Sequence, residues 1–226
     1  MSAPLHLYDK LLQFTLFQGM SHADLMEVVT HTKIGFHKLT KGKCIATAGD
    51  PCTRLTFLIN GSIQAEHTAD NRAYRVVEVL QAPYLPEPER LFGIQQRYTH
   101  TYTTLSDANL ITIDKQEVLL LLETQLVFRL NMLNMMATET HRLLHHPWRP
   151  CPKSLRERLT HFFFAHCQYP AGAKTFYILM RQLADLLNDS RLDISDALNA
   201  MQSDGLLTLH RGRIEIPMLE RLLMIC

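Results

Sequence analysis

Residues 181–207 read RQLADLLNDSRLDISDALNAMQSDGLL, a pattern that predicts two short helices joined by a tight turn. The first helix has one apolar stripe at helical spacing. The members of this stripe are Met180, Leu183, Ala184 and Leu187. Asn188 follows the stripe, and asparagine tolerates the left-handed conformation that a sharp turn between helices needs. We therefore expect the first helix to end at Asn188.

A second helix is predicted to begin after Ser190, because Asp193 stands three residues later and can return a capping hydrogen bond. Gly205 would end this helix. Its buried face is expected at Ile194, Ala197, Leu198 and Met201. Its outward face carries Arg191, Leu192, Ser195, Asp196 and Asn199. By itself, such a helix pair is equally typical of a helical hairpin inside an all-helical domain.

The residues that follow the pair favour a more specific interpretation. Residues 206–209 and 213–216 alternate in period two around His210-Arg211-Gly212, which predicts a β-hairpin. A helix-turn-helix followed at once by a hairpin is a winged helix, whose second helix fits the major groove of DNA. The outward face of that helix then supplies the candidate base contacts. Candidate phosphate contacts are Lys153, Arg181, Ser190, Arg211 and Arg213.

This stretch resembles the DNA-binding domain of the Crp/Fnr regulators, whose motif reads approximately R-x-x-L/I-A/G-x-x-x-G-x-S-R-E-T-V-x-R-x-L-x-x-L. The matching residues are Arg181, Leu183, Ala184, Ser190, Arg191, Ile194 and Leu198. Asn188 replaces the turn glycine, Leu192 the glutamate and Asp196 the second arginine. The resemblance implies a homodimer that binds an inverted repeat in double-stranded DNA, with RNA polymerase as a candidate partner.

Between residues 33 and 113 the pattern changes to short β-rich runs separated by Gly, Asn and Asp turns, which is typical of a β-sandwich or barrel. We predict strands at residues 33–39, 44–47, 55–59, 62–66, 74–80, 101–105 and 110–113. The phrases TAGD at residues 47–50 and LTFLINGSI at residues 55–63 resemble the cyclic-nucleotide-binding jelly roll of the same family.

The predicted fold class is α+β, in three parts. The parts are an N-terminal β-jelly-roll sensor domain at residues 1–123, a dimerisation helix at residues 124–146, and a winged helix-turn-helix domain at residues 147–226.

The resemblance places an effector pocket at residues 83–99, and this segment departs from the cyclic AMP pattern. In cyclic-nucleotide binders of the family, F-G-E followed by R-S holds the ribose and the cyclic phosphate, because a buried anion needs such donors. Here Ile94 stands in place of the glutamate, Tyr98-Thr99 replaces Arg-Ser, and strand alternation aims Arg97 at the opposite face. We therefore expect an effector other than cyclic AMP. The expected pocket residues are Phe92, Gly93, Ile94, Arg97, Tyr98 and Thr99.

Residues 124–144 return to a helical pattern with two apolar faces. One face is a heptad seam of Leu126, Leu130, Leu133, Ala137, Thr140 and Leu144. The other face carries Phe128, Met132, Met135 and Met136 and can lie on the jelly roll. Because a helix that is apolar on two faces needs two partners, we predict a parallel two-fold homodimer. A single deeply buried helix is the alternative.

Residues 145–150 (HHPWRP) are predicted to end the helix and form a hinge, because proline cannot continue a helix.

Composition restricts the function only weakly. The net charge is +1, and residues 147–226 hold ten Lys and Arg against eight Asp and Glu, a small positive charge for a DNA-binding domain. No apolar run approaches the ~18 residues of a membrane span, so we expect a cytoplasmic protein without membrane contact. Five cysteines at scattered spacings fit reduced thiols better than a disulfide framework.

The twelve histidines raise the question of a metal or haem. His141 and His145 have a spacing that can ligate zinc, but no Cys or acidic residue at helical spacing completes the set, so we expect no metal site. Iron–sulfur relatives carry a cysteine cluster near the N-terminus, whereas the first cysteine here is Cys44. We therefore expect no iron–sulfur cluster. Haem stays open as a cofactor, because haem-binding relatives share no motif.

Two functions of different class follow from the sequence. The first is a transcription regulator whose jelly roll senses an unidentified small molecule. The second is a sensor or scaffold of the same fold that acts through protein partners, without sequence-specific DNA binding. Asp193 and Asp196 around Arg191 keep the second open, because DNA phosphates repel carboxylates, although an Asp can accept a hydrogen bond from cytosine N4. No nucleophile–base constellation supports an enzyme.

Overall fold

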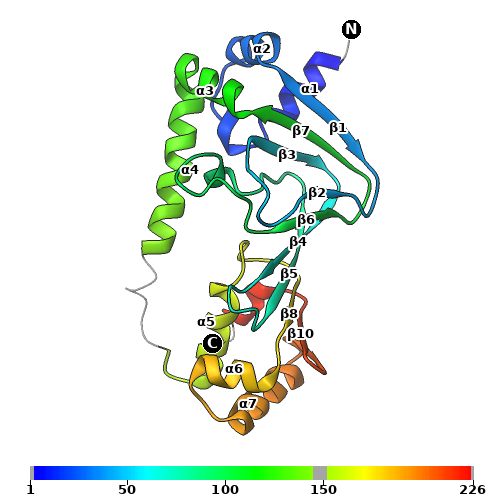
Figure 1. The fold of residues 1–226 in the computed structure, drawn as a ribbon, viewed down its shortest axis with the longest axis vertical. Helices are drawn as coiled ribbons and strands as arrows, with labels where there is room; N and C mark the ends of the chain where they lie inside the picture. Colours follow the sequence, from blue (N-terminus) through cyan, green and yellow to red (C-terminus); the bar gives the residue numbers. More distant parts are fainter. Residues whose placement is uncertain (1–2, 145–151, 225–226) are drawn as a thin grey trace. The chain divides into compact units, whose positions relative to one another are not determined.

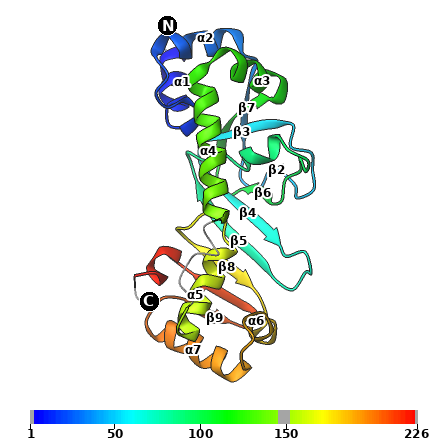
Figure 2. The same ribbon diagram turned by 90° about the vertical axis from the view of Figure 1, so that its left-hand side faces the viewer.

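The computed structural model of the chain describes residues 3–144 and 152–224 and divides into two compact units (Figures 1 and 2). The first unit holds residues 1–62, 81–99 and 103–149, and the second holds residues 63–80, 100–102 and 150–226. The second unit therefore includes a segment from the middle of the predicted jelly roll. The predicted hinge at residues 145–150 lies outside the described residues.

The first unit is built on an antiparallel sheet of the order β1-β7-β3, with β1 at Ile34–Leu39, β7 at Ala108–Asp114 and β3 at Arg54–Asn60. The two faces of this sheet differ in chemistry. One face is apolar, and its Phe57 ring lies 5.0 Å from the ring of Phe14 and 5.6 Å from that of Phe17. The other face presents Thr56 and Thr112, which are opposite each other in the β3–β7 register.

Helices complete the apolar side of the first unit. They are α1 (Ala3–Leu11), the short 3-10 helix η1 (Thr15–Phe17), α2 (His22–His31), α3 (Lys115–Thr124) and α4 (Leu126–Leu144). Phe128 of α4 is fully buried, and its ring lies 5.4 Å from that of Phe17. Gln125 separates α3 from α4, and its side chain donates to Glu27 Oε2 of α2 over 2.9 Å. The long helix predicted from the sequence is confirmed from Leu126 onward.

No single helix within residues 3–144 and 152–224 is long and apolar enough to cross a membrane. Together, α3 and α4 would be long and apolar enough by length and composition only, but they are bent by 113° at their junction.

The seven strands predicted between residues 33 and 113 are all present. The remaining four are β2 (Cys44–Ala46), β4 (Ser62–Thr68), β5 (Arg75–Gln81) and β6 (Thr101–Thr104). Gly61 joins β3 to β4 with a φ of +91°, and a Cβ there would lie 2.6 Å from the carbonyl oxygen of Asp107. The turn predicted at Asn60-Gly61 therefore requires glycine for its backbone angle and for space.

The second unit is a winged helix extended by strands from the hairpin β4–β5. Its elements in chain order are α5 (Leu155–Ala165), β8 (Lys174–Tyr177), α6 (Met180–Leu187), α7 (Arg191–Ser203), β9 (Thr208–His210), β10 (Arg213–Ile216) and the 3-10 helix η4 (Leu219–Leu222). The strand order is β4-β5-β8-β10-β9. Its apolar core includes Phe163, Phe176, Ile194 and Leu198, and β5 contributes Val76 to the same core. The helix-turn-helix and the wing predicted from the sequence are confirmed.

Some local features of this unit do not follow from the neighbouring sequence. Residues 174–177, for which the sequence predicts no strand, form β8 and pair with β5 and β10. The pattern of residues 154–167 predicts a helix with Ala165 buried and with Arg156 and Arg158 free. The helix is present, but Ala165 is exposed, and Arg156 and Arg158 pair with Asp204 and Asp189. The short final helix that the apolar segment after Pro217 predicts is present as the 3-10 helix η4.

His166 is a partly buried histidine of the second unit, and we expect it to make the stability of that unit depend on pH. Its ring stacks on Phe162 and meets the edge of Tyr74, and burial lowers its pKa, while the hydrogen bond from Nδ1 to the Phe162 carbonyl opposes that shift. Because the folded state then prefers the neutral ring, the unfolded chain takes up the proton first as pH falls below about 6.5. We expect the urea midpoint to fall between pH 7.5 and pH 5, and less steeply in His166→Gln. A drop of the same size in both proteins would contradict this, and His141→Gln, which changes an exposed histidine, is the control.

Candidate functional site

The turn between α6 and α7 is fixed by a residue outside the helix-turn-helix. Asn188 has a φ of +51° and ends α6, as its position in the sequence predicts. Arg158 of α5 donates from Nη1 to the Leu187 carbonyl over 3.1 Å and pairs through Nη2 with Asp189. A guanidinium that bridges a helix-end carbonyl and a carboxylate holds both groups in one geometry. No local sequence pattern predicts this contact, because Arg158 lies about 30 residues from the turn.

The N-terminus of α7 is capped as predicted. Ser190 Oγ accepts from the Asp193 amide over 3.1 Å and donates to Asp193 Oδ2 over 2.6 Å. The Ser190 amide donates to Asp189 Oδ1 over 2.8 Å. Asp193 and Asp189 are therefore both engaged in fixing the start of α7. Their carboxylates serve the turn, which reduces the number of acidic groups that the outward face of α7 presents freely.

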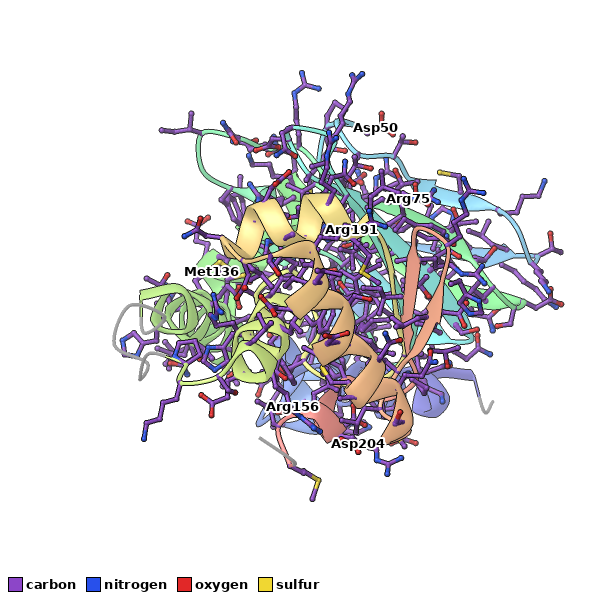
Figure 3. All side chains as sticks on the ribbon, turned by 90° about the horizontal axis from the view of Figure 1, so that it is seen from below. Asp50, Arg75, Met136, Arg156, Arg191 and Asp204 are labelled. Carbon is purple, nitrogen blue, oxygen red and sulfur yellow. The ribbon has the colours of Figure 1, made fainter. Side chains whose placement is uncertain are left out.

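The outward face of α7 is the candidate base-reading surface (Figure 3). Arg191 lies at one end of the helix, and the pair of Asp204 with Arg156 lies at the other, with 2.7 Å between Oδ2 and Nη1. Leu192 is 76% exposed, and Arg191, Asp196 and Asn199 are also exposed, whereas Ser195 is half-buried. Among the described residues, neither Arg191 nor Asp196 has an ion-pair partner. The buried face consists of Ile194, Leu198 and Met201, all of them fully buried, with Ala197 partly covered.

The predicted phosphate contacts fall into two groups. Lys153, Arg181 and Arg211 are exposed and, within residues 152–224, make no ion pair. Arg213 is half-buried, and its Nε lies 3.1 Å from Glu215 Oε1. Glu215 also meets His210 Nε2 over 3.2 Å, so the base of the wing carries a negative charge that Arg213 partly balances. The hydroxyl of Ser190 is occupied by the cap described above.

The predicted dimer seam lies on the outside of α4. Leu126, Leu130 and Leu133 are 57%, 49% and 59% exposed, and Ala137 is exposed as well. The opposite face of the same helix is covered, because Phe128 and Met132 are buried in the first unit. The side chain of Leu144 lies outside the described residues. The helix therefore has two apolar faces, of which the described part of the chain covers one.

A cavity of about 410 Å³ lies on the Thr56–Thr112 face of the β1-β7-β3 sheet. Its polar lining includes His37, Thr56, Tyr98 and Thr112, and β2 adds Cys44, Ile45 and Ala46 to the wall. His37 Nε2 lies 3.0 Å from Thr112 Oγ1. Burial raises the pKa of Tyr98, so its phenol stays protonated. This volume suits a small organic molecule.

The six residues predicted to form an effector pocket are not gathered around this cavity. Tyr98 lines it, but Ile94 is fully exposed, and Arg97 points to the surface, where Nη1 donates to the Gly49 carbonyl over 2.6 Å. Phe92 and Gly93 lie just after the 3-10 helix η2 (Pro88–Leu91) and do not line the cavity. Alternation between an exposed Arg97 and a buried Tyr98 follows the strand-like pattern expected from the sequence.

Glu87 is a buried carboxylate that the sequence did not single out. Its side chain is 1% exposed, and its Oε2 accepts from Thr99 through the amide at 2.8 Å and through the hydroxyl at 2.9 Å. Arg90 Nε lies 3.7 Å from the same oxygen. The amide and the hydroxyl of Thr99 therefore both donate to the carboxylate of Glu87.

Comparison with known proteins agrees with this architecture. Residues 36–125 match the family model of the cyclic nucleotide-binding domain, and residues 157–225 match that of the Crp-like helix-turn-helix domain. A β-roll followed by a winged helix-turn-helix defines a class of DNA-binding transcription regulators. Because the two models together cover well over half of its length, the chain belongs to the Crp/Fnr family of this class.

Solved structures share the fold at low sequence identity. The catabolite activator protein of Thermus thermophilus is 18% identical, with a TM-score of 0.51 over 94% of this chain and 98% of that one. The sensor domain of the regulator DNR from Pseudomonas aeruginosa is 18% identical, with a TM-score of 0.54 over 69% of this chain and all of that one. A Eubacterium rectale protein assigned to the Crp/Fnr family is 20% identical, with a TM-score of 0.50 over 94% and 97%. No curated protein matches the chain in sequence.

Proposed function

We propose that the protein is a dimeric transcription regulator that reads an inverted repeat through α7 and is controlled by a small molecule in its β-roll. The observation that carries the proposal is the outward face of α7, where Arg191 is exposed and has no ion-pair partner among the described residues. An arginine at the start of a recognition helix can donate two hydrogen bonds to guanine O6 and N7. In this proposal two of the acidic residues near it, Asp189 and Asp193, are already engaged within the turn and the cap.

Selection of genomic DNA fragments tests the proposal directly. Purified protein should retain a subset of fragments, and sequencing should reveal one inverted repeat among them. Its half-sites should lie about 10 bp apart, because two recognition helices related by a two-fold axis meet the major groove one helical turn apart. Retention of all fragments in proportion to their length would favour the alternative, a sensor that acts through protein partners. RNA polymerase is a candidate partner of the bound regulator.

In this proposal, two copies of the chain dimerise through α4, and the dimer brings two recognition helices to one inverted repeat. The exposed leucines of the seam repeat at heptad spacing, and a second copy of the same helix would bury them. Exposed leucine side chains in such a row are costly to leave in water, at about 25 cal/mol for each Å². The row therefore fits an isologous contact between two copies of the chain.

The proposed effector site is the cavity on the Thr56–Thr112 face. The lining combines hydroxyl groups and one imidazole with apolar walls from β2, and its two charged side chains, Arg54 and Asp50, have opposite sign. Such a lining suits a small, largely uncharged molecule that forms hydrogen bonds to hydroxyl groups.

Cyclic AMP is expected not to bind at micromolar concentrations. Thr99, which the family pattern aligns with a phosphate-binding serine, already directs its amide and hydroxyl to Glu87, and the Glu87 carboxylate would repel a phosphate. Isothermal calorimetry with the full-length protein checks this. Stoichiometric heat at micromolar cyclic AMP would show that an arginine such as Arg90 or Arg97 holds the phosphate instead.

The wing is expected to contribute charge without sequence preference. Arg211→Ala should weaken binding to every DNA fragment alike and reduce the slope of log K against log salt by about one, because one phosphate contact is lost. Arg213→Ala is a matched comparison and should have a smaller effect, since its guanidinium is already shared with Glu215. Titrations of fluorescent DNA at several salt concentrations measure both slopes. A change in base preference on removing Arg211 would place that residue in a groove rather than on a phosphate.

A further inference from the structure

Strand β5 continues the sheet of the wing within the second unit. It pairs antiparallel with β8, with Val76 opposite Phe176 and Glu78 opposite Lys174, and β8 pairs on its other side with β10. Figures 1 and 2 both show β5 alongside β8. The hairpin β4–β5 therefore belongs to the same sheet as the wing, although Glu78 of β5 and Lys174 of β8 are 96 residues apart in the sequence.

A buried ion pair holds the two strands together. Glu78 Oε2 lies 2.7 Å from Lys174 Nζ, and the two side chains are 2% and 0% exposed. The same carboxylate accepts from the amides of Gln168 at 2.7 Å and Tyr169 at 3.1 Å, so three donors converge on it. The Lys174 ammonium also lies 5.8 Å from the centre of the Tyr169 ring. A buried charge pair of this kind is costly to break from one side, because the remaining charge loses its partner away from water.

Apolar contacts surround the pair. Val76 is 1% exposed and belongs to the same core as Phe176 and the buried face of α7. Tyr74, at the start of β5, packs edge-on against Phe162 of α5 at 5.7 Å. At the same end of β5, Arg75 lies over the ring of Tyr177 at 4.2 Å from its centre. The strand is thus attached by backbone pairing, a buried charge and ring contacts.

We propose that the β4–β5 hairpin is a positioning element for DNA binding, and that Glu78 is its key residue. Strand β5 and the Glu78–Lys174 pair fix β8, and β8 in turn fixes β10 and with it the wing that carries Arg211. Neither Glu78 nor Lys174 contacts DNA in this arrangement, and each acts through the sheet. The proposal rests on the proposed DNA binding, because its functional consequence is affinity for the operator.

The test compares Lys174→Met, Glu78→Gln and the double variant Glu78→Gln/Lys174→Met in the full-length protein. Each single variant leaves one buried group without its partner, whereas the double variant removes the charge from both. We expect Lys174→Met to speed hydrogen exchange of the β8 and β10 amides at least tenfold and to weaken operator binding at least tenfold. The double variant should recover most of both losses. Glu66→Gln, which removes a partly exposed pair with Arg75 in the same hairpin, is the matched control and should change neither quantity more than about twofold.

Two measurements keep the inference and the proposed function separate. Unchanged operator affinity in Lys174→Met, together with faster exchange in β8 and β10, would overturn the positioning role, because the wing would then bind DNA without the hairpin's support. Unchanged exchange would overturn the proposal by itself, whether or not DNA binds. If the wild-type protein bound no DNA sequence specifically, the regulator function would fail, and the exchange data would still show whether the hairpin holds the wing.

Discussion

Replacing Leu130 and Leu133 with Asp should convert the protein from a dimer to a monomer. Both side chains are about half exposed in one copy of the chain, so they do not support the core of the protomer, and their exposure is what a helix partner would remove. Placed in the seam, four carboxylates would face one another across the two-fold axis without compensating cations. Desolvating each unpaired charge costs several kcal/mol, and the substitutions also remove the apolar contact that the two leucines would make.

The consequence for DNA binding should be larger than for folding. A palindrome is bound by two helix-turn-helix units at once, and loss of that linkage lowers affinity by about 10²- to 10⁴-fold without altering any single contact. Sedimentation velocity gives the oligomeric state, and titration with a full palindrome and with a half-site gives the two affinities. We expect the palindrome affinity of the double variant to fall to that of a half-site.

Thr138→Asp is the matched control for this experiment. Thr138 is exposed on α4, but its heptad position lies away from the seam, so a carboxylate there should leave the dimer intact. Circular dichroism would show whether the seam variant keeps its helices. A variant that stayed dimeric would mean that the contact between copies lies elsewhere, and a variant that unfolded would mean that the seam is internal core.

Local sequence patterns predicted most of the fold because the physical causes are themselves local. The cap at Ser190 needs only a carboxylate three residues on, and it is present, as is the same arrangement of Ser21 and Asp24 at the start of α2. Asn188 predicted the left-handed turn because few other residues tolerate it at low cost. β-rich runs between Gly, Asn and Asp turns predicted the strands of the β-roll, and in β4 and β5 buried residues alternate with less buried ones.

The failures share a different cause, which is partners far away in the sequence. Strand β8 was missed because the sequence Lys174-Thr175-Phe176-Tyr177 puts a lysine at an inward position, and only Glu78 from another part of the chain makes that burial tolerable. Glu87 gave no signal because its partner Thr99 lies in a later segment. The effector pocket, which the family resemblance places at Phe92, Gly93, Ile94, Arg97, Tyr98 and Thr99, stays a prediction, and of these six residues only Tyr98 lines the cavity.

Arg191→Ala should remove the strongest base-specific contact of the proposed regulator. If Arg191 donates to guanine O6 and N7, its loss should cost about 1–3 kcal/mol at one base pair of each half-site and abolish the preference for guanine there. The effect is doubled on a palindrome, because each copy of the chain loses one contact. Affinity for operators already mutated at that base pair should change much less, since the arginine has no guanine to bind in them.

Arg181→Ala is the matched comparison, because it removes the same side chain from an exposed position on α6 that is expected to face phosphate. Its loss should weaken all DNA sequences alike and leave base preference unchanged. A panel of operator variants, each changed at one base pair, separates the two patterns.

Asp196 adds a second test on the same panel, because its exposed carboxylate, which has no ion-pair partner among the described residues, can accept only from an amino group such as cytosine N4. Asp196→Asn should therefore relax a preference for cytosine one turn along α7 from the base that Arg191 reads. If wild type, Arg191→Ala and Asp196→Asn all bound every operator variant with equal affinity, α7 would not read sequence, and the protein would act through protein partners instead.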